Sequence, residues 1–249
     1  MTEDGYDDTF WAEVKEASAA HVAMEAERRR LDALEEWRRT CPWEFEQADW
    51  ESVLAREPAH PPAVLAPLEA WCASPGPSLV LMGSLGAGKT HLACAVAHRL
   101  VSTLGVWATF SSVEAMMAAL QEGFRSGEPS RGAATLGTYS QPGLLVLDDL
   151  ASGRLMPTEW EAKVLNELFN RRWSSGKPTV VTSNLSMAAA GPGEVFEDPS
   201  QVASIRDLRS YVGERTYDRL RDGSAIVLVG QSLRGRRAPA PCSRDLGTR

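Results

Sequence analysis

The chain has 249 residues, 43% of them apolar and 24% charged, with a formal net charge of −7, which is an ordinary globular composition. This length is sufficient for one α/β domain and an additional segment. Because no apolar run reaches the roughly 20 residues of a membrane span and the acidic N-terminus lacks a signal-peptide pattern, we expect a cytoplasmic protein without a membrane partner.

The first 67 residues predict one long helix and a connecting region. In residues 10–39, apolar side chains recur mostly at three- and seven-residue spacings, and Glu25 with Arg29 is a favourable pair four residues apart. The apolar stripe is narrow, so this helix is expected to pack on the body or on a partner protein. Residues 42–67 contain five prolines and are expected to form a linker with short turns.

From residue 78 onward, strand patterns alternate with helical patterns, which predicts an α/β fold with a parallel sheet covered on both faces. Thr158 and Glu161 form a capping-box pattern at the start of one helix. Residues 125–143 and 186–200 are rich in small and turn-forming residues and are expected to be loops. The expected strands are residues 79–82, 106–110, 144–147, 179–182 and 225–229, and the expected helices are residues 89–104, 113–124 and 158–173.

Cysteine and histidine spacing gives no sign of a metal site or a disulfide framework. The four cysteines are Cys41, Cys72, Cys94 and Cys242, and no two of them form a C-x-x-C pair. The four histidines add no metal-ligand spacing to this set. The sequence therefore predicts neither a zinc site nor disulfide bonds.

Charge is distributed unevenly along the chain. Residues 1–57 carry 16 acidic and 7 basic side chains, net −9, and residues 58–249 carry 17 acidic and 19 basic side chains, net +2. Residues 200–249 hold 10 arginines against 5 acidic residues, net +5, which suits contact with phosphate or nucleic acid. A solvated basic face explains the arginines at the end of the chain equally well.

A complete phosphate-loop motif, G-x-x-x-x-G-K-[ST], follows the first expected strand at residues 83–90. Its glycines permit backbone conformations in which successive N–H groups converge on nucleotide phosphates at the start of a helix. Lys89 places a positive charge on the β- and γ-phosphates, and the Thr90 hydroxyl is a candidate ligand for Mg²⁺. ATP and Mg²⁺ are therefore the expected cofactors.

Two carboxylates end the apolar run of residues 144–147, at the end of a parallel strand where ligands of open α/β sheets bind. Asp148 is the candidate for the Mg²⁺ shell, together with Thr90, and Asp149 is the candidate that orients or deprotonates the attacking water. On its own, such a pair after a strand is more typical of a turn or a helix cap. Because a phosphate loop lies upstream, the metal-binding and water-activating roles are favoured here over a turn or a helix cap.

A third polar group, Asn184, ends the β-branched strand pattern of residues 179–182. An asparagine in this position could hydrogen-bond the γ-phosphate or the attacking water. On local grounds it could equally cap the following helix.

Together these residues resemble the AAA+ ATPases that load bacterial replicative helicases, the DnaC and DnaI type, and the related IstB transposition helpers. The resemblance covers roughly residues 42–234, and its specific parts include the His91-Leu-Ala extension of the phosphate loop and the Asp218-Arg-Leu segment. It implies a P-loop AAA+ fold preceded by an N-terminal helical segment. The residues assigned to cofactor binding are Gly83, Ser84, Leu85, Gly86, Ala87, Gly88, Lys89, Thr90 and His91.

The resemblance also implies catalytic roles. Asn184 corresponds to sensor 1, Arg219 to the arginine finger offered to a neighbouring subunit's nucleotide, and Arg234 to the sensor-2-like residue. Arg215, one helical turn before Arg219, is the rival finger, and any of these arginines could instead form an ordinary surface ion pair. The family often has Glu where this chain has Asp149, so turnover is expected to be slow and dependent on assembly.

The expected domains are an acidic helical partner-binding segment with a linker at residues 1–57, an AAA+ ATPase domain at 58–235, and a basic, disordered tail at 236–249. The leading hypothesis is an ATP-dependent loader that binds a ring-shaped hexameric replicative helicase through the N-terminal segment and single-stranded DNA through an AAA+ homo-oligomer formed with ATP. The alternative is a transposition helper that binds double-stranded DNA and recruits a transposase. A third possibility is a nucleotide-controlled binding module with negligible hydrolysis.

Overall fold

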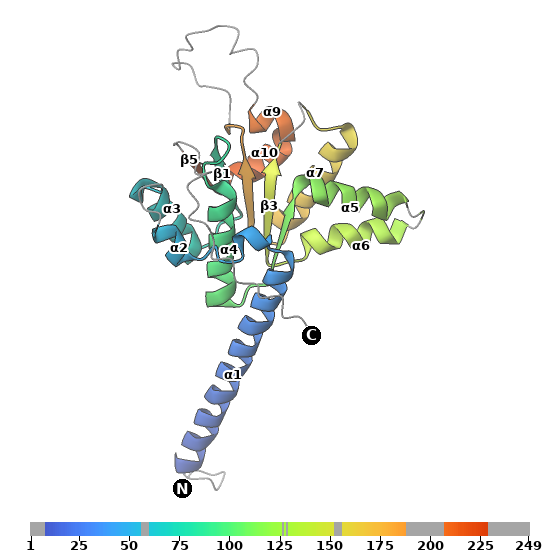
Figure 1. The fold of residues 1–249 in the computed structure, drawn as a ribbon. Helices are drawn as coiled ribbons and strands as arrows, with labels where there is room; N and C mark the ends of the chain where they lie inside the picture. Colours follow the sequence, from blue (N-terminus) through green and yellow to red (C-terminus); the bar gives the residue numbers. More distant parts are fainter. Residues whose placement is uncertain are drawn as a thin grey trace, which may run out of the picture.

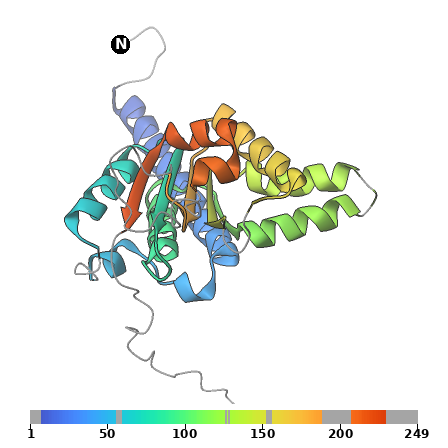
Figure 2. The same cartoon turned by 90° about the horizontal axis from the view of Figure 1, so that it is seen from above.

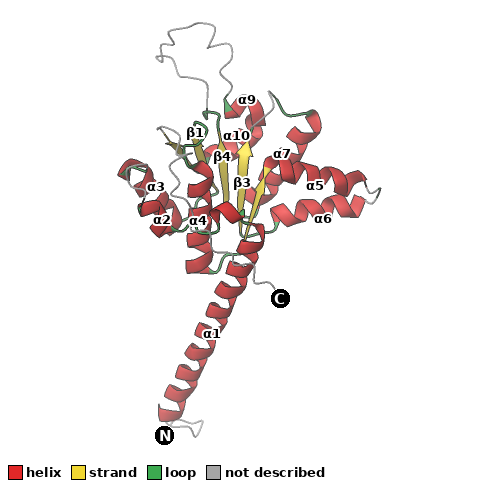
Figure 3. Cartoon of the chain, viewed as in Figure 1, coloured by secondary structure: helices red, strands yellow, loops and turns green. Residues whose placement is uncertain are grey.

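The computed structural model describes residues 8–55, 60–125, 127, 129–151, 156–187 and 207–228. Its centre is a parallel five-stranded sheet in the order β2-β3-β4-β1-β5, enclosed by helices (Figures 1 and 3). The strands are β1 (Ser78–Gly83), β2 (Ala108–Ser112), β3 (Leu144–Leu150), β4 (Thr179–Ser183) and β5 (Ser224–Leu228). All five expected strands are therefore confirmed, although β2 begins and ends two residues later than expected.

The helices occupy the connections between the strands and the segment before the sheet. They are α1 (Asp8–Thr40), the short 3-10 helix η1 (Trp43–Phe45), α2 (Trp50–Leu54), α3 (Pro62–Ala73), α4 (Lys89–Leu104), α5 (Val113–Arg125), α6 (Pro129–Ser140), α7 (Glu159–Ser174), α9 (Leu208–Val212) and α10 (Glu214–Arg221). No helix in the described ranges is long and apolar enough to cross a membrane.

Alternate residues of each strand face opposite sides of the sheet, as the pleat requires. Along β1, Leu79 and Leu81 join an apolar cluster with α1, α3 and α4, whereas Val80 and Met82 join a second cluster with α5, α7, α9 and α10. The central strands β1, β3 and β4 are buried on both faces, and β1 and β3 accordingly contain continuous apolar runs, whereas the edge strand β5 alternates exposed and buried residues. The expected three-layer α/β arrangement is confirmed.

The capping box expected before α7 is present. Thr158 Oγ1 accepts a hydrogen bond from the Glu161 N–H at 3.2 Å, and Glu161 Oε2 accepts one from the Thr158 N–H at 2.7 Å. These contacts satisfy two backbone donors that the helix itself cannot pair.

The prediction of a loop across residues 125–143 was wrong, because residues 129–140 form α6. This helix runs beside α5, and both extend away from the sheet (Figures 1 and 2). Small residues permit the close contact: a Cβ added to Gly132 would lie 2.4 Å from the Phe124 ring, and one added to Gly123 would lie 2.8 Å from Thr135 Oγ1. Packing against α5 therefore outweighs the weak helix propensity of these residues.

The expected linker of residues 42–67 also contains more helix than its prolines suggested. Asp49 caps α2 by accepting a hydrogen bond from the Ser52 N–H at 2.7 Å. Pro62 occupies the first position of α3, where a missing N–H costs nothing. Pro67 lies within α3, whose buried Leu68 and Trp71 fix the helix to the core.

α1 confirms the predicted N-terminal helix, but only its last turns contact the body. Ala33 and Trp37 are buried in the same cluster as α4, and the Arg30 Nε donates a hydrogen bond to the carbonyl of Ser102 at 2.7 Å. Thr40 Oγ1 accepts a hydrogen bond from the N–H of Phe110 in β2 at 3.1 Å. Buried side chains between Ala33 and Val53, which precede the expected domain boundary at residue 57, therefore share one apolar core with the helices and strands that follow it.

The buried Arg172 of α7 ties the end of α6 to the start of β4. The residue is 1% exposed, and its guanidinium donates to the Thr179 hydroxyl at 2.8 Å and to the carbonyls of Tyr139 at 3.1 Å, Pro142 at 2.9 Å and Pro178 at 2.5 Å. Burial lowers the pKa of Arg172 to about 9, so the group remains charged at neutral pH. Carbonyl dipoles rather than a carboxylate compensate its charge.

Replacing Arg172 with Met should lower the free energy of unfolding by about 3–5 kcal/mol, because it leaves several buried carbonyl groups without donors. Arg171→Met is the matched control: its side chain is about half exposed and pairs with Glu167 four residues earlier. The control should change stability by less than about 0.5 kcal/mol. Urea denaturation measures both, and equal effects would show that the buried contacts carry little stability.

Candidate nucleotide-binding site

The candidate groups converge at one edge of the sheet. The phosphate loop follows β1, Asp148 and Asp149 lie near the end of β3, and Asn184 follows β4. Because β3, β4 and β1 are parallel neighbours, their C-terminal ends lie side by side. This is the edge at which open α/β sheets bind ligands.

The backbone of the phosphate loop has the form that the motif predicts. Gly86 and Gly88 have φ angles of 81° and 91°, in the region that residues with a side chain rarely adopt, and α4 begins at Lys89 immediately afterwards. Ser84 and Leu85 are exposed at the tip, whereas Ala87 is buried. The loop therefore presents backbone and a helix N-terminus to an anion at the sheet edge.

Lys89 is 6% exposed and is held within this loop. Its Nζ donates hydrogen bonds to the carbonyls of Gly83 and Ser84, both at 2.9 Å, and to Oδ1 of Asn184 at 2.7 Å. The structure thus brings Asn184 into direct contact with the lysine of the phosphate loop. A γ-phosphate bound by Lys89 would also lie within reach of the Asn184 amide.

Asp148 is buried beside two hydroxyl groups. Its Oδ1 accepts hydrogen bonds from Thr90 Oγ1 at 2.9 Å and from Thr182 Oγ1 at 2.6 Å. Burial raises the pKa of Asp148, and the Thr182 hydrogen bond opposes that shift. A desolvated carboxylate next to a threonine hydroxyl is an oxygen donor set that fits Mg²⁺.

No cluster of three or more His, Cys, Asp or Glu side chains suited to a metal occurs among the described residues. Mg²⁺ at phosphate sites is usually held by one or two protein ligands together with substrate oxygens and water. Thr90 and Asp148 are the residues here that would hold the ion.

Thr182, which the sequence reasoning did not select, links the two carboxylates. Its hydroxyl donates to Asp148 and accepts a hydrogen bond from the Asp149 N–H at 2.9 Å. The pairing of β3 with β4 shifts register between Leu147 and Leu150, and Asp149 has a φ of 58°. The available signal was a hydroxyl residue two positions before Asn184 in the neighbouring strand.

Because of this register shift and the positive φ of Asp149, the adjacent carboxylates of Asp148 and Asp149 occupy different environments. Asp148 faces the buried hydroxyls, whereas Asp149 is exposed. A non-glycine residue in the left-handed region costs roughly 1–2 kcal/mol and is often retained at functional sites. The arrangement can hold a cation with one carboxylate and contact a solvent molecule with the other.

His91 lies at the first turn of α4 and contacts the segment before the sheet. Its Nε2 is 3.3 Å from Ser52 Oγ in α2, and its ring stacks on that of His60 with centroids 6.4 Å apart. His91 therefore couples α2 to the helix that carries the phosphate loop.

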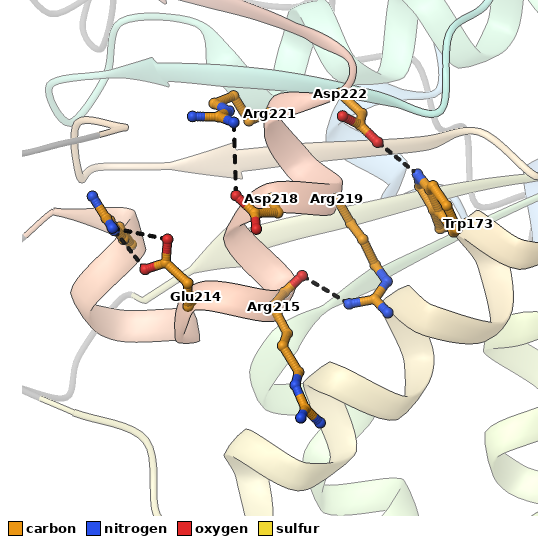
Figure 4. Close-up of polar contacts among 8 residues, drawn as sticks. Trp173, Glu214, Arg215, Asp218, Arg219, Arg221 and Asp222 are labelled. Carbon is orange, nitrogen blue, oxygen red and sulfur yellow. Dashed lines mark hydrogen bonds and ion pairs between the residues drawn. The ribbon is translucent and has the colours of Figure 1, made fainter.

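Two of the arginines expected near a neighbouring nucleotide, Arg215 and Arg219, lie on α10 (Figure 4). Arg219 folds back onto its own chain: it donates to Asn170 Oδ1 at 2.7 Å and to the Arg215 carbonyl at 2.8 Å, and its guanidinium lies 5.7 Å from the centre of the Trp173 ring. Arg215 is exposed, and within the described chain its guanidinium makes no hydrogen bond or ion pair. Arg234 and the expected basic tail lie outside the described residues.

The sheet order, the phosphate loop at the start of α4 and the buried carboxylate at the end of β3 define a P-loop ATP-binding protein with the AAA+ fold. The family model for IstB-like ATP-binding proteins matches residues 65–210, more than half of the sequence. The chain belongs to that family.

Two curated relatives are similar over different lengths. The replicative helicase loader DnaC of Escherichia coli K12 is 27% identical over 152 residues, which cover 61% of this chain and 53%, about half, of DnaC. A putative ATP-binding protein in an insertion sequence of Mycobacterium tuberculosis H37Rv is 31% identical over 218 residues, covering 86% of this chain and 79% of the relative.

Solved structures share the fold. A crystal structure of the DnaC helicase loader is 24% identical with a TM-score of 0.52, covering 69% of this chain and 90% of that one. Domain III of the Thermotoga maritima replication initiator DnaA is 19% identical with a TM-score of 0.51, covering 68% of this chain and 63% of that one. These likenesses confirm the AAA+ fold.

Asp148→Asn should leave the free protein at least as stable as the wild type at neutral pH. Because the folded-state pKa of Asp148 is raised, stability linked to its proton is present at low pH and is lost as pH rises through that pKa. Asparagine avoids the cost of the buried anion while keeping an oxygen for Thr182.

The same variant should lose stabilisation by the Mg²⁺–ATP complex. In the wild type, ligand at about 100 times its Kd should add about 2.7 kcal/mol to the free energy of unfolding. Thermal unfolding with and without Mg²⁺ and ATP measures both effects, with the exposed Asp32→Asn as control. A destabilised free protein or an unchanged Mg²⁺ response would contradict this role of Asp148.

Proposed function

We propose that the chain is an ATPase whose phosphate loop, residues 83–90, binds ATP with Mg²⁺ held by Thr90 and Asp148. The observation that carries this proposal is the contact of Lys89 with Asn184, beside the hydrogen bond from Thr90 to Asp148. Mg²⁺, when bound, would neutralise and orient the β- and γ-phosphate oxygens. Membership of an ATP-binding family supports the choice of nucleotide.

We further propose a division of labour among the polar groups around the phosphate. Lys89 would move from its backbone partners to the β- and γ-phosphates, and Asn184 would hydrogen-bond the γ-phosphate or the attacking water. Asp149 would orient that water, because it is the exposed member of the carboxylate pair. Its side chain is one carbon shorter than glutamate, so we expect slow hydrolysis.

Lys89→Ala should weaken ATP binding about 100-fold or more, since two charge-assisted contacts to phosphate are worth roughly 3 kcal/mol. Lys163→Ala is the matched control, because Lys163 lies exposed on α7 and pairs with Glu159. Calorimetric titration with ATP and Mg²⁺ measures both variants. Near-wild-type affinity in folded Lys89→Ala protein would disprove the assigned site.

For the biological role, we propose an ATP-dependent loader that delivers a hexameric replicative helicase to DNA. In this proposal residues 1–57 bind the helicase, and residues 58–235 form an ATP-dependent homo-oligomer that contacts single-stranded DNA. Support comes from the similarity to the E. coli loader DnaC. The net charge of −9 in residues 1–57 provides a surface unlike that of the rest of the chain.

A second role, as a helper that binds double-stranded DNA and recruits a transposase, is favoured by one observation. The insertion-sequence relative from M. tuberculosis aligns with 86% of this chain, more than DnaC does. Binding of the full chain to single- and double-stranded DNA of equal length, with ATP and with ADP, separates the roles. Lys89→Ala is the control for nucleotide dependence.

We propose that an arginine of α10 acts on the nucleotide of a neighbouring subunit. A guanidinium at this position stabilises the charge that phosphoryl transfer spreads over the equatorial oxygens. The family resemblance favours Arg219, but its contacts with Asn170 and Trp173 must break before it can reach another chain. The Arg215 guanidinium has no such contacts to break, so we assign the role of arginine finger to Arg215. Arg219 would instead hold α10 in place against α7.

Arg215→Ala should bind ATP normally and lose about a thousandfold in the turnover of the assembled protein. Mixing it with Lys89→Ala protein should restore part of the activity, because an intact nucleotide site can then lie beside a subunit that keeps Arg215. The same mixture made with Arg219→Ala provides the comparison. Recovery only in the Arg219→Ala mixture would return the role to Arg219.

A further inference from the structure

Thr182 of β4 lies between the two carboxylates at the end of β3. The residue is fully buried, and its hydroxyl donates a hydrogen bond to Asp148 Oδ1 at 2.6 Å and accepts one from the Asp149 N–H at 2.9 Å. A hydroxyl has one donor and two acceptor positions, so both bonds can form at the same time. One side chain therefore holds the carboxylate of Asp148 and the backbone of Asp149 together.

The burial pattern along β3 shows that this strand contains one extra residue beside that hydroxyl. In an unbroken strand, residues 145, 147 and 149 would face the same side of the sheet. The structure instead places Leu145, Leu147 and Leu150 together in the apolar cluster with α5 and α7. Asp149 is exposed. The extra residue thus keeps the Asp149 carboxylate out of the core, where burial of an unpaired charge would be costly.

The extra residue lies opposite Thr182. While β3 advances three residues, from Leu147 to Leu150, the paired strand β4 advances two, so both aspartates oppose one threonine. Bulges of this kind are frequent beside active sites, where they redirect a side chain. Here the Thr182 hydroxyl accepts the bond from the Asp149 N–H, and Asp149 has a φ of 58°. The threonine thereby supports a backbone conformation that residues with a side chain rarely adopt.

The end of β4 contacts both parts of the candidate site. Through Thr182 it is bonded to Asp148, whose Oδ1 also accepts the hydrogen bond from Thr90 at 2.9 Å. Two residues later, Asn184 accepts a hydrogen bond from Lys89 at 2.7 Å. A change at Thr182 is therefore transmitted to the carboxylates without touching the lysine that would hold the phosphates.

We propose that Thr182 is a positioning residue for ATP hydrolysis, because its hydroxyl fixes the Asp148 carboxylate and holds Asp149 in the conformation that exposes its carboxylate. This role rests on the proposed ATPase function and deepens it. Thr182 contacts neither the nucleotide nor the metal and acts through the two aspartates. A β-branched residue suits the role, since the methyl group restricts rotation about χ1 and keeps the hydroxyl directed at both partners.

Thr182→Val removes the hydroxyl and keeps the shape of the side chain. At saturating ATP and Mg²⁺, the kcat of the full chain should fall about tenfold to a hundredfold, as expected for small misplacements of catalytic groups. The Kd for ATP with Mg²⁺, measured by calorimetry, should stay within about threefold of wild type, since a positioning role is expressed mainly in the transition state. Thr182→Ser keeps both hydrogen bonds and should recover most of the kcat.

Thr179→Val is the matched control. Thr179 is another buried threonine of β4, and its hydroxyl accepts a hydrogen bond from Arg172 Nε at 2.8 Å. Both valine variants lose a buried hydrogen bond, so the midpoint of urea denaturation should fall in both. Thr179→Val should nevertheless keep the wild-type kcat. Equal losses of kcat in the two variants would make Thr182 a structural residue and overturn the proposal.

A double-mutant cycle tests whether Thr182 acts through Asp149. Asp149→Asn alone should lower kcat, and adding Thr182→Val should then cost less than it does in the wild-type background. The reason is that the carboxylate exposed by this backbone conformation is already absent. A double variant whose loss equals the product of the two single losses would contradict the proposal.

Amide hydrogen exchange measures the same contact without catalysis. The Asp149 amide should exchange about tenfold faster or more in Thr182→Val than in the wild type or Thr182→Ser, because its acceptor is lost. An unchanged exchange rate, or an unimpaired kcat of Thr182→Val beside normal wild-type turnover, would overturn this role alone. A wild-type chain that binds ATP without any turnover would refute the proposed hydrolysis itself, and the role of Thr182 with it.

Discussion

The arrangement of the site depends on the burial of two opposite charges at one edge of the sheet. The ammonium of Lys89 and the carboxylate of Asp148 are each less than a tenth exposed, and neither can remain there without hydrogen-bond partners. The partners come from three neighbouring elements: Thr90 from α4, Thr182 from β4 and Asn184 after β4. Satisfying these charges fixes the phosphate loop relative to the strand ends.

Local patterns carried most of what could be predicted. The phosphate loop combines glycine conformations, a lysine and a helix start within eight residues. The central strands β1 and β3 are continuous apolar runs because both of their faces are covered. Sequence adjacency was also enough to place Asp148 and Asp149 at a strand end. Sequence adjacency could not distinguish the environments of the two carboxylates. The register shift at Asp149 is accompanied by a hydrogen bond to Thr182, which lies over thirty residues away in the sequence.

Features that depend on long-range packing escaped prediction. α6 looked like a loop because its glycines and serines disfavour helix, yet those glycines admit α5 at close range. Arg172 resembled one of several charged residues on an exposed helix, and only the fold brings the carbonyls of Tyr139, Pro142 and Pro178 around it. The restraint on Arg219 by Asn170 and Trp173 is likewise invisible along the sequence.

The contact between Thr40 and Phe110 has a consequence for aggregation. β2 is the outermost strand on its side of the sheet, and outer strands present backbone groups on which strands of other chains can assemble. The last turns of α1 occupy that margin. Removal of the last turns of α1 would expose the backbone groups of this edge strand, so resistance of the chain to fibre-like association depends on this helix end.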